Sequence, residues 1–243
     1  RRWIKFLTDI LPRFSCELAA SLSDFEKRML QMFYITVFQE AADWRSHTTQ
    51  ANMQLLADSP IMMHELNELL SFNLERIDFI DQPVPLGFDC PLDLHCTYTR
   101  DQILIAMDYM TPKNVREGVK WLPDKQVDVF FITLNKADKD YSPTTMYNDY
   151  SINESLFHWQ SQSTTSDTAS TGQRYINHRQ RGSKVVLFVR EFKQDSIGAA
   201  PYTCLGTAAY VKHTGSKPMN ITWHLDQPIP AKYLRKTNKL VVG

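Results

Sequence analysis

The spacing of apolar residues changes once along this 243-residue chain, near Gly118. Before that point, apolar side chains recur at steps of three and four residues, as from Phe25 to Phe38, which is typical of an amphipathic helix. After it, β-branched and aromatic residues form short runs such as Val127–Leu134, bounded by Gly, Pro and Ser. The sequence therefore predicts an α+β protein with a helical bundle over residues 1–117 and a β domain over residues 118–243.

Local signals predict where helices begin. Ser23 with Glu26 three residues later is a capping box, and Thr99 with Gln102 is a second one. Pro60 also suits a helix start, because the first turn needs no backbone N–H at that position. We therefore expect helices over these stretches: Ser23 to Phe38, Asn52–Leu56, Ile61–Ile77, and Thr99 through Met107.

The second part of the chain favours a closed antiparallel barrel. Few amphipathic stretches separate its predicted strands, which argues against a parallel α/β sheet. A polar segment from Tyr141 to His178, studded with aromatic residues, forms one long connection. The predicted strands are Val119–Trp121, Val127–Leu134, Lys184–Phe192, Tyr202–Lys212 and Met219–Leu225.

Charge is distributed unevenly, although lysine plus arginine and aspartate plus glutamate both total 27. Residues 1–171 hold 15 basic and 24 acidic residues, whereas residues 172–243 hold 12 basic and 3 acidic ones. A basic region attracts a phosphate backbone, because each cationic contact releases counterions. The alternative is a solvated surface or a flexible tail.

The first residues, the hydropathy and the cysteines indicate what kind of protein this chain comes from and where it resides. The chain opens at Arg1 without an initiator Met or a signal segment, so we expect it to be a piece of a longer polypeptide. No apolar run approaches the roughly 20 residues that cross a bilayer. The four cysteines show no Cys-x-x-Cys spacing, which indicates a reducing compartment and predicts a cytoplasmic protein.

Motifs for catalysis are largely missing. The sequence holds neither a P-loop nor a His-x-Lys pair, so we expect neither ATP hydrolysis nor phospholipase-D-type cleavage. The alternative is a metal-dependent nuclease in which Asp128 and Glu191 hold the metal and Lys193 activates water.

A second group of possible metal ligands also lacks the pattern of a known site. Cys90, His95 and Cys96 could ligate zinc, but they lack a fourth ligand and a standard spacing, so small buried cysteines are favoured. We therefore expect a binding module without a metal, a cofactor or catalytic residues of its own.

Aromatic and amide side chains alternate in two nearby stretches, Phe157–Gln162 and Thr171–His178. A protein that takes a base out of the stack needs flat rings against its faces and amides at its edge. Trp159 and Tyr175 are candidates for the rings, and Gln160 and Gln162 for the edge. The alternative is that the two rings pack in the core while the amides cap loops. In that case Tyr147 and Tyr150 are the next candidates for the pocket.

Six basic residues lie in or beside predicted loops of the second part and are candidates for phosphate contacts. They are Arg174, Arg179, Arg181, Lys184, Lys212 and Lys217.

Several motifs together resemble one family, the C-terminal domain of SauUSI-type ATP-dependent type IV restriction enzymes. This domain follows a phospholipase-D-like nuclease and a superfamily II helicase. The helical part, with Tyr98-Thr99-Arg100, resembles the segment that joins the helicase to it. The motifs of the second part are Asp128–Lys136, Ser142-Pro143, Tyr147 to Tyr150, Phe157–Gln162, Gly172–Tyr175, Val189–Glu191, Leu205-Gly206, Gly215–Met219 and Pro228–Pro230.

The resemblance implies a fold, a ligand and partners. It implies a PUA-like or SRA-like barrel that recognises 5-methylcytosine or 5-hydroxymethylcytosine in double-stranded DNA by flipping the base. The implied partners are the helicase and nuclease domains of the same polypeptide. ATP, with Mg²⁺ as a candidate second cofactor, would serve those domains and not this part of the chain.

Overall fold

The computed structural model describes the whole chain except residues 78–79, 136–148 and 238–243. It divides into two compact units. The first comprises Arg1–Pro83, Asp89–Asp93 and Arg100–Val115, and the second comprises Val84–Phe88, Leu94–Thr99 and Arg116–Gly243. Two short stretches of the amino-terminal half thus belong to the unit that contains the strands.

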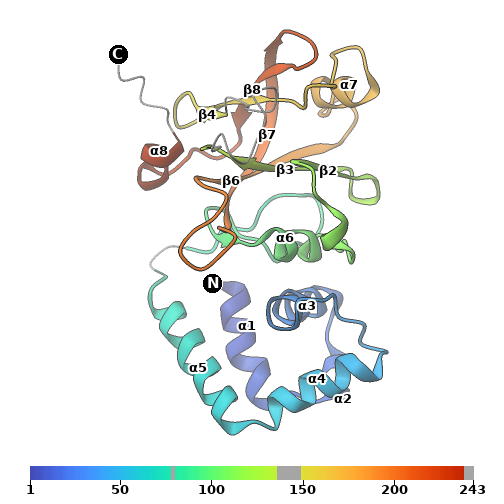
Figure 1. Ribbon diagram of the computed structural model, residues 1–243, viewed down its shortest axis with the longest axis vertical. Helices are drawn as coiled ribbons and strands as arrows, with labels where there is room; N and C mark the ends of the chain where they lie inside the picture. The colour runs from blue at the N-terminus through green and yellow to red at the C-terminus, as the bar shows by residue number, and fades with distance from the viewer. Residues whose placement is uncertain (78–79, 136–148, 238–243) are drawn as a thin grey trace. The chain divides into compact units, whose positions relative to one another are not determined.

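The first unit is helical, as the apolar spacing predicts. Its core is formed by side chains such as Leu7, Leu30, Tyr34 and Met53. Figure 1 shows α1 beside α5, and the two helices are in contact. Its elements are α1 (Arg2–Ile10), η1 (Leu11–Arg13), α2 (Cys16–Ser21), α3 (Asp24–Phe38), α4 (His47–Ala57), α5 (Pro60–Glu75), α6 (Arg100–Ala106) and η2 (Pro112–Asn114).

The predicted start signals of α3 and α5 are confirmed. The Ser23 backbone N–H donates to Glu26 Oε2 over 2.9 Å, and the Glu26 N–H donates to Ser23 Oγ over 3.3 Å, which completes a capping box. Ser59 caps α5 by accepting the Met62 N–H at Oγ, without a reciprocal bond, and Pro60 stands at the first helical position. Both helices therefore begin where local hydrogen bonding satisfies their first free amides.

The second unit is built on one mixed sheet of eight strands. The order is β2-β3-β6-β7-β8-β5-β4, with β1 paired to β7. Its elements are β1 (Thr97–Tyr98), β2 (Val119–Leu122), η3 (Pro123–Lys125), β3 (Val127–Thr133), β4 (Tyr150–Ser151), β5 (Leu156–Gln160), α7 (Ser170–Ile176), β6 (Lys184–Arg190), β7 (Tyr202–Thr214), β8 (Asn220–Leu225) and α8 (Ala231–Thr237).

The prediction of a closed antiparallel barrel is wrong in two respects. The sheet is open among the described residues, with β2 and β4 at its edges, and β3 pairs with β6 in parallel. The cause is the long segment after β3. Instead of a simple loop it contains β4, β5 and α7, so the chain returns to β3 by a crossover and β6 runs in the same direction.

The open sheet nevertheless curls until its inner face packs on itself. Phe130 of β3 and Trp159 of β5 are separated by three strands in the sheet order, yet their ring centroids lie 4.3 Å apart. Register shifts occur at Leu187/Phe188 and at Tyr210/Lys212, and such bulges increase local bending. The resulting core resembles that of a barrel without closure by hydrogen bonds.

A glycine substitution tests how closely α7 packs in this unit. Replacing a helical glycine with alanine ordinarily stabilises a helix by about 1 kcal/mol. At Gly172, however, a Cβ atom would overlap the backbone carbonyl oxygen of Ser166. We therefore expect Gly172→Ala to lower the free energy of unfolding by about 1–3 kcal/mol, measured by urea denaturation.

Gly118→Ala is the matched control, because its Cβ would lie at an ordinary 3.5 Å from the nearest atom, the Phe131 carbonyl oxygen. Equal free energies of unfolding for the two variants would show that α7 is not packed as described.

Candidate nucleic-acid interface

The alternation of β5 separates the residues predicted to form one base pocket. Phe157 and Trp159 are buried, whereas His158 and Gln160, which alternate with them, are half-buried. Successive side chains of a strand point to opposite faces of the sheet. Trp159 therefore points to the inner face, and Gln160 points to the outer face.

Trp159 and Tyr175 come together as predicted, but within the core. They are 5 % and 3 % exposed, and their rings meet edge to face at 5.6 Å. Phe130 lies 4.3 Å from Trp159, and Trp223 lies 6.5 Å from Tyr175. Burial raises the pKa of the Tyr175 hydroxyl. These four side chains, Phe130, Trp159, Tyr175 and Trp223, are called the aromatic cluster below.

The aromatic cluster changes what a substitution at Trp159 can reveal. Truncating a buried aromatic side chain costs roughly 3–5 kcal/mol of stability. Loss of DNA binding by Trp159→Ala would therefore not distinguish a base pocket from a damaged core. The structure corresponds to the alternative in which both rings pack in the core.

Other predicted residues lie on the outer face of the sheet. Tyr150 of β4 is opposite His158, and their rings are stacked at 4.8 Å with an interplanar angle of 15°. Gln160 Nε2 donates to Asn220 Oδ1 over 3.0 Å. Exposed Lys212 shares this face, because it is opposite Thr222, which in turn is opposite His158.

The remaining predicted residues are scattered or fall outside the description. Tyr147 lies outside the described residues. Gln162 is exposed in the loop after β5, and Lys217 is exposed in the turn between β7 and β8, where its backbone N–H donates to the Thr165 carbonyl oxygen. Neither belongs to the Tyr150 and Gln160 group by strand register.

Arg174 is held inside the second unit. Its Nε and Nη2 atoms donate to the two oxygens of Asp128 over 2.7 and 2.9 Å, and its guanidinium lies 4.4 Å from the Trp121 ring centroid. Asp128 is fully buried. Burial raises the pKa of the Asp128 carboxyl, and the bonds from Arg174 oppose that rise. Arg174 thus links α7 to β3. Because its guanidinium group binds both oxygens of Asp128, it is not turned toward a phosphate.

The three residues of the nuclease alternative do not converge. Asp128 is opposite Val185 in the β3–β6 register, and Glu191 lies six residues beyond Val185, a separation of roughly 20 Å along a strand. Lys193 is exposed beyond the end of β6. The Asp128 carboxylate is also paired with Arg174.

No group of three or more His, Cys, Asp or Glu side chains in the described ranges could hold a metal ion. Of the two cysteines among the possible zinc ligands, Cys90 is buried as expected, whereas Cys96 is half-buried. Burial raises the pKa of the Cys90 thiol to about 11. Such a thiol stays protonated near neutral pH.

A short loop gathers three of the predicted phosphate contacts. Arg179 and Arg181 are exposed, and Lys184 begins β6 at the end of the loop. Arg179 and Lys184 line a surface cleft of about 390 Å³, together with backbone of Gly182 and with Asp226. Arg179 Nη2 pairs with Asp226 Oδ1 at 2.7 Å, and Lys184 Nζ donates to the Pro85 carbonyl oxygen over 2.6 Å. Residues 177–184 are called the basic loop below.

His178 anchors the basic loop and was missed by the sequence analysis. The ring is 2 % exposed; Nδ1 lies 3.2 Å from the Ser183 carbonyl oxygen, and Nε2 accepts the Tyr210 N–H over 3.2 Å. This arrangement fits a neutral imidazole with its proton on Nδ1. Burial lowers the pKa of His178, and the hydrogen bond to the Ser183 carbonyl opposes this effect. Weaker effects come from nearby Arg179, which lowers the pKa further, and from Asp226, which raises it.

The other functional candidates that sequence reasoning missed are His158 and Asn220. The period-two pattern of Leu156–Gln160 was the available signal, since it predicts a strand whose alternate residues face outward. Recognising that strand would have placed His158 with Gln160 and not with Trp159.

Comparison with known families shows which family the chain belongs to. A family model described as a domain of unknown function (DUF3427) matches residues 92–236. The chain belongs to this family. No curated protein is a match for the sequence. Within the described residues, no helix has both the length and the apolar character needed to cross a membrane.

The Asp128–Arg174 pair gives a stability prediction. Removing one partner of a buried ion pair leaves an uncompensated charge and costs about 3–5 kcal/mol. We expect Asp128→Asn to lower the free energy of unfolding by this amount in urea denaturation. Arg179→Ala, which breaks the exposed pair with Asp226, should cost at most about 1 kcal/mol. Similar costs for the two variants would contradict the assigned role of Asp128.

His178 gives a prediction about pH. Because its pKa is lower in the folded than in the unfolded chain, the unfolded chain takes up the proton first, and stability falls as pH drops below about 6.5. Lowering the pH from 7.5 to 5.5 should therefore destabilise the wild type more than His178→Gln, in urea midpoints compared at both values. His95, whose pKa burial also lowers, remains in both proteins, so identical pH dependence would exclude His178 as a cause.

Proposed function

We propose that the second unit is a DNA-binding module that recognises 5-methylcytosine or 5-hydroxymethylcytosine in double-stranded DNA. In this proposal it is the target-recognition part of a helicase–nuclease type IV restriction enzyme. The resemblance of the quoted motifs supports the ligand class. The family match over residues 92–236 covers the same stretch of chain, although the family itself has no described function.

The observation that carries DNA binding is the basic loop. It presents Arg179 and Arg181 to solvent and places Lys184 with Arg179 in a cleft. It lies within the last 72 residues, which hold 12 basic and 3 acidic side chains. Among the described residues, Arg179 forms its ion pair with the partly exposed Asp226, and exposed pairs are weak enough for a phosphate to compete.

The finer fold assignment belongs to the same proposal. A curled, mostly antiparallel sheet with a packed inner face supports a PUA-like or SRA-like class, with an opening where a barrel would close. Base flipping is part of the proposal, because a methyl group adds only about 0.8 kcal/mol of apolar burial. A fitted site around an extruded base is needed for strong discrimination.

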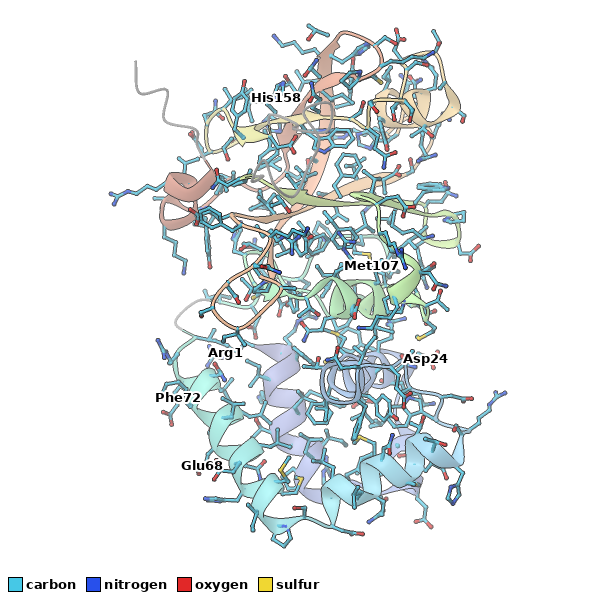
Figure 2. The ribbon with its side chains drawn as sticks, viewed as in Figure 1. Arg1, Asp24, Glu68, Phe72, Met107 and His158 are labelled. Atoms are coloured by element: carbon cyan, nitrogen blue, oxygen red, sulfur yellow. The ribbon has the colours of Figure 1, made fainter. Side chains whose placement is uncertain are left out.

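The proposed partners of the chain are the helicase and nuclease domains of the same polypeptide. ATP and Mg²⁺ would serve those domains, and this chain would contribute no catalytic residue. The helical unit offers α5 for the contact with the helicase, since Ile61, Met62, Leu69 and Phe72 are 50–76 % exposed. Figure 2 labels Phe72 and Glu68 on this helix.

Binding to three otherwise identical duplexes tests the proposal. Wild-type protein should bind duplexes that carry 5-methylcytosine or 5-hydroxymethylcytosine more tightly than the unmodified duplex, measured by fluorescence anisotropy at a fixed salt concentration. Equal affinity for all three duplexes would refute recognition of modified cytosine.

The basic loop gives a separate prediction. Arg179→Ala with Arg181→Ala should weaken binding to modified and unmodified duplexes alike. It should also flatten the plot of log affinity against log salt by about 0.9 for each lost phosphate contact. Arg13→Ala with Arg45→Ala, which removes the same charge from exposed positions of the helical unit, is the control. An unchanged slope for the loop variant would place these arginines away from DNA.

A further inference from the structure

The outer face of β5 carries a flat aromatic surface. The Tyr150 and His158 rings are nearly parallel, at 4.8 Å and 15°, and both side chains are half-buried. They are opposite each other across β4 and β5, where β4 is an edge strand of two residues. Figure 2 labels His158 on this part of the sheet. Aromatic rings on a sheet face are surfaces on which bases stack, because every base has a π-face.

An amide pair lies in the next row of the same face. Gln160 is opposite Asn220, and Gln160 Nε2 donates to Asn220 Oδ1. In the described part of the chain, these two side chains make no other side-chain hydrogen bond, which leaves Gln160 Oε1 as an acceptor and Asn220 Nδ2 as a donor. One acceptor beside one donor is the pattern that the Watson–Crick edge of a nucleobase requires.

A lysine lies on the same face, in the same row across the strands as His158. Lys212 is opposite Thr222, and Thr222 is opposite His158, so Lys212 lies two strands from the ring pair, roughly 10 Å away. Its side chain is exposed. This spacing suits a phosphate next to a base that stacks on the rings.

The arrangement fits an unstacked base and not a paired one. A base inside a duplex exposes only its edges in the grooves, whereas this face offers a ring to stack on and amides for an edge that pairing would occupy. The aromatic cluster is a poorer candidate for the same task, since Trp159 and Tyr175 pack against Phe130 and are at most 5 % exposed.

We propose that the outer face of β5 and β8 binds one unstacked nucleobase, with the Tyr150–His158 ring pair as its stacking surface. Gln160 and Asn220 address the edge of the base, and Lys212 contacts the adjoining phosphate. The identity of the base as a modified cytosine rests on the proposed function. The stacking site itself requires only single-stranded or extruded DNA.

The test measures binding of wild type, His158→Ala, His158→Phe and His224→Ala by fluorescence anisotropy. The probes are a 12-nucleotide single strand and unmodified and 5-methylcytosine duplexes. Loss of a base–aromatic stack should weaken single-strand binding by His158→Ala about 5- to 150-fold. His158→Phe, which keeps a ring, should restore most of it. His224→Ala, the same change at an exposed position on this face of β8, should bind like wild type.

The duplexes distinguish this inference from the proposed function. If the flipped base binds here, His158→Ala weakens binding to the methylated duplex and leaves the unmodified duplex unchanged. If wild type shows no preference among duplexes but His158→Ala loses the single strand, the proposed function fails and the stacking site stands.

Three results would overturn the stacking site. The first is unchanged single-strand affinity in His158→Ala, and the second is no single-strand binding by wild type. The third is a lower unfolding temperature for His158→Ala with no recovery of binding in His158→Phe, which would give the ring pair only a structural role between β4 and β5.

Discussion

The second unit depends on the packing of the aromatic cluster. Phe130, Trp159, Tyr175 and Trp223 come from β3, β5, α7 and β8, and they hold β3 against β5 and β8, which lie apart from β3 in the order of the sheet. Burying one large apolar side chain contributes about 1.5–3 kcal/mol, so this contact is strong enough to keep an unclosed sheet curled. It also decides which side chains face outward. Because Trp159 points into the cluster, His158 and Gln160 must point away from it.

Two polar contacts inside the second unit fix α7 and the basic loop. Arg174 reaches from α7 to Asp128 of β3, and His178 joins the basic loop to the Tyr210 amide of β7. Each satisfies polar groups that would be costly to leave alone inside a core. The consequence is a defined position for Arg179, Arg181 and Lys184, which would otherwise sit on an unconstrained loop.

The sequence predicted the fold wherever a local pattern was complete. The capping box at Ser23 and the runs of β-branched and aromatic residues in β3, β6, β7 and β8 indicate their elements directly, because their signals lie within a few residues. The parallel pairing of β3 with β6 could not be predicted this way. It depends on where β4 and β5 join the sheet, and this is decided by contacts between residues that are far apart in the sequence. β5 and α7 were hidden because their polar and aromatic composition resembles that of a loop.

The candidate site was predictable in composition but not in grouping. Aromatic and amide residues around Phe157–Gln162 did mark a distinctive stretch, yet assigning Trp159 and Gln160 to one pocket ignored the alternation of a strand. Arg174 was counted with the surface cations because nothing in sequence pairs it with Asp128, 46 positions away. Three of the six predicted phosphate contacts, Arg179, Arg181 and Lys184, lie in the basic loop because they are neighbours in the chain.

In the proposed complex, DNA contacts the outer face of β5 and the basic loop while the aromatic cluster stays closed. Nuclear magnetic resonance during titration with a 5-methylcytosine duplex can detect both contacts and the state of the cluster. We expect shifts of the backbone amide signals of His158, Gln160, Lys212 and the basic loop, with the indole N–H signals of Trp159 and Trp223 nearly unchanged. A large shift of the Trp159 indole signal with no change at His158 and Gln160 would contradict this proposal and place the base in the aromatic cluster.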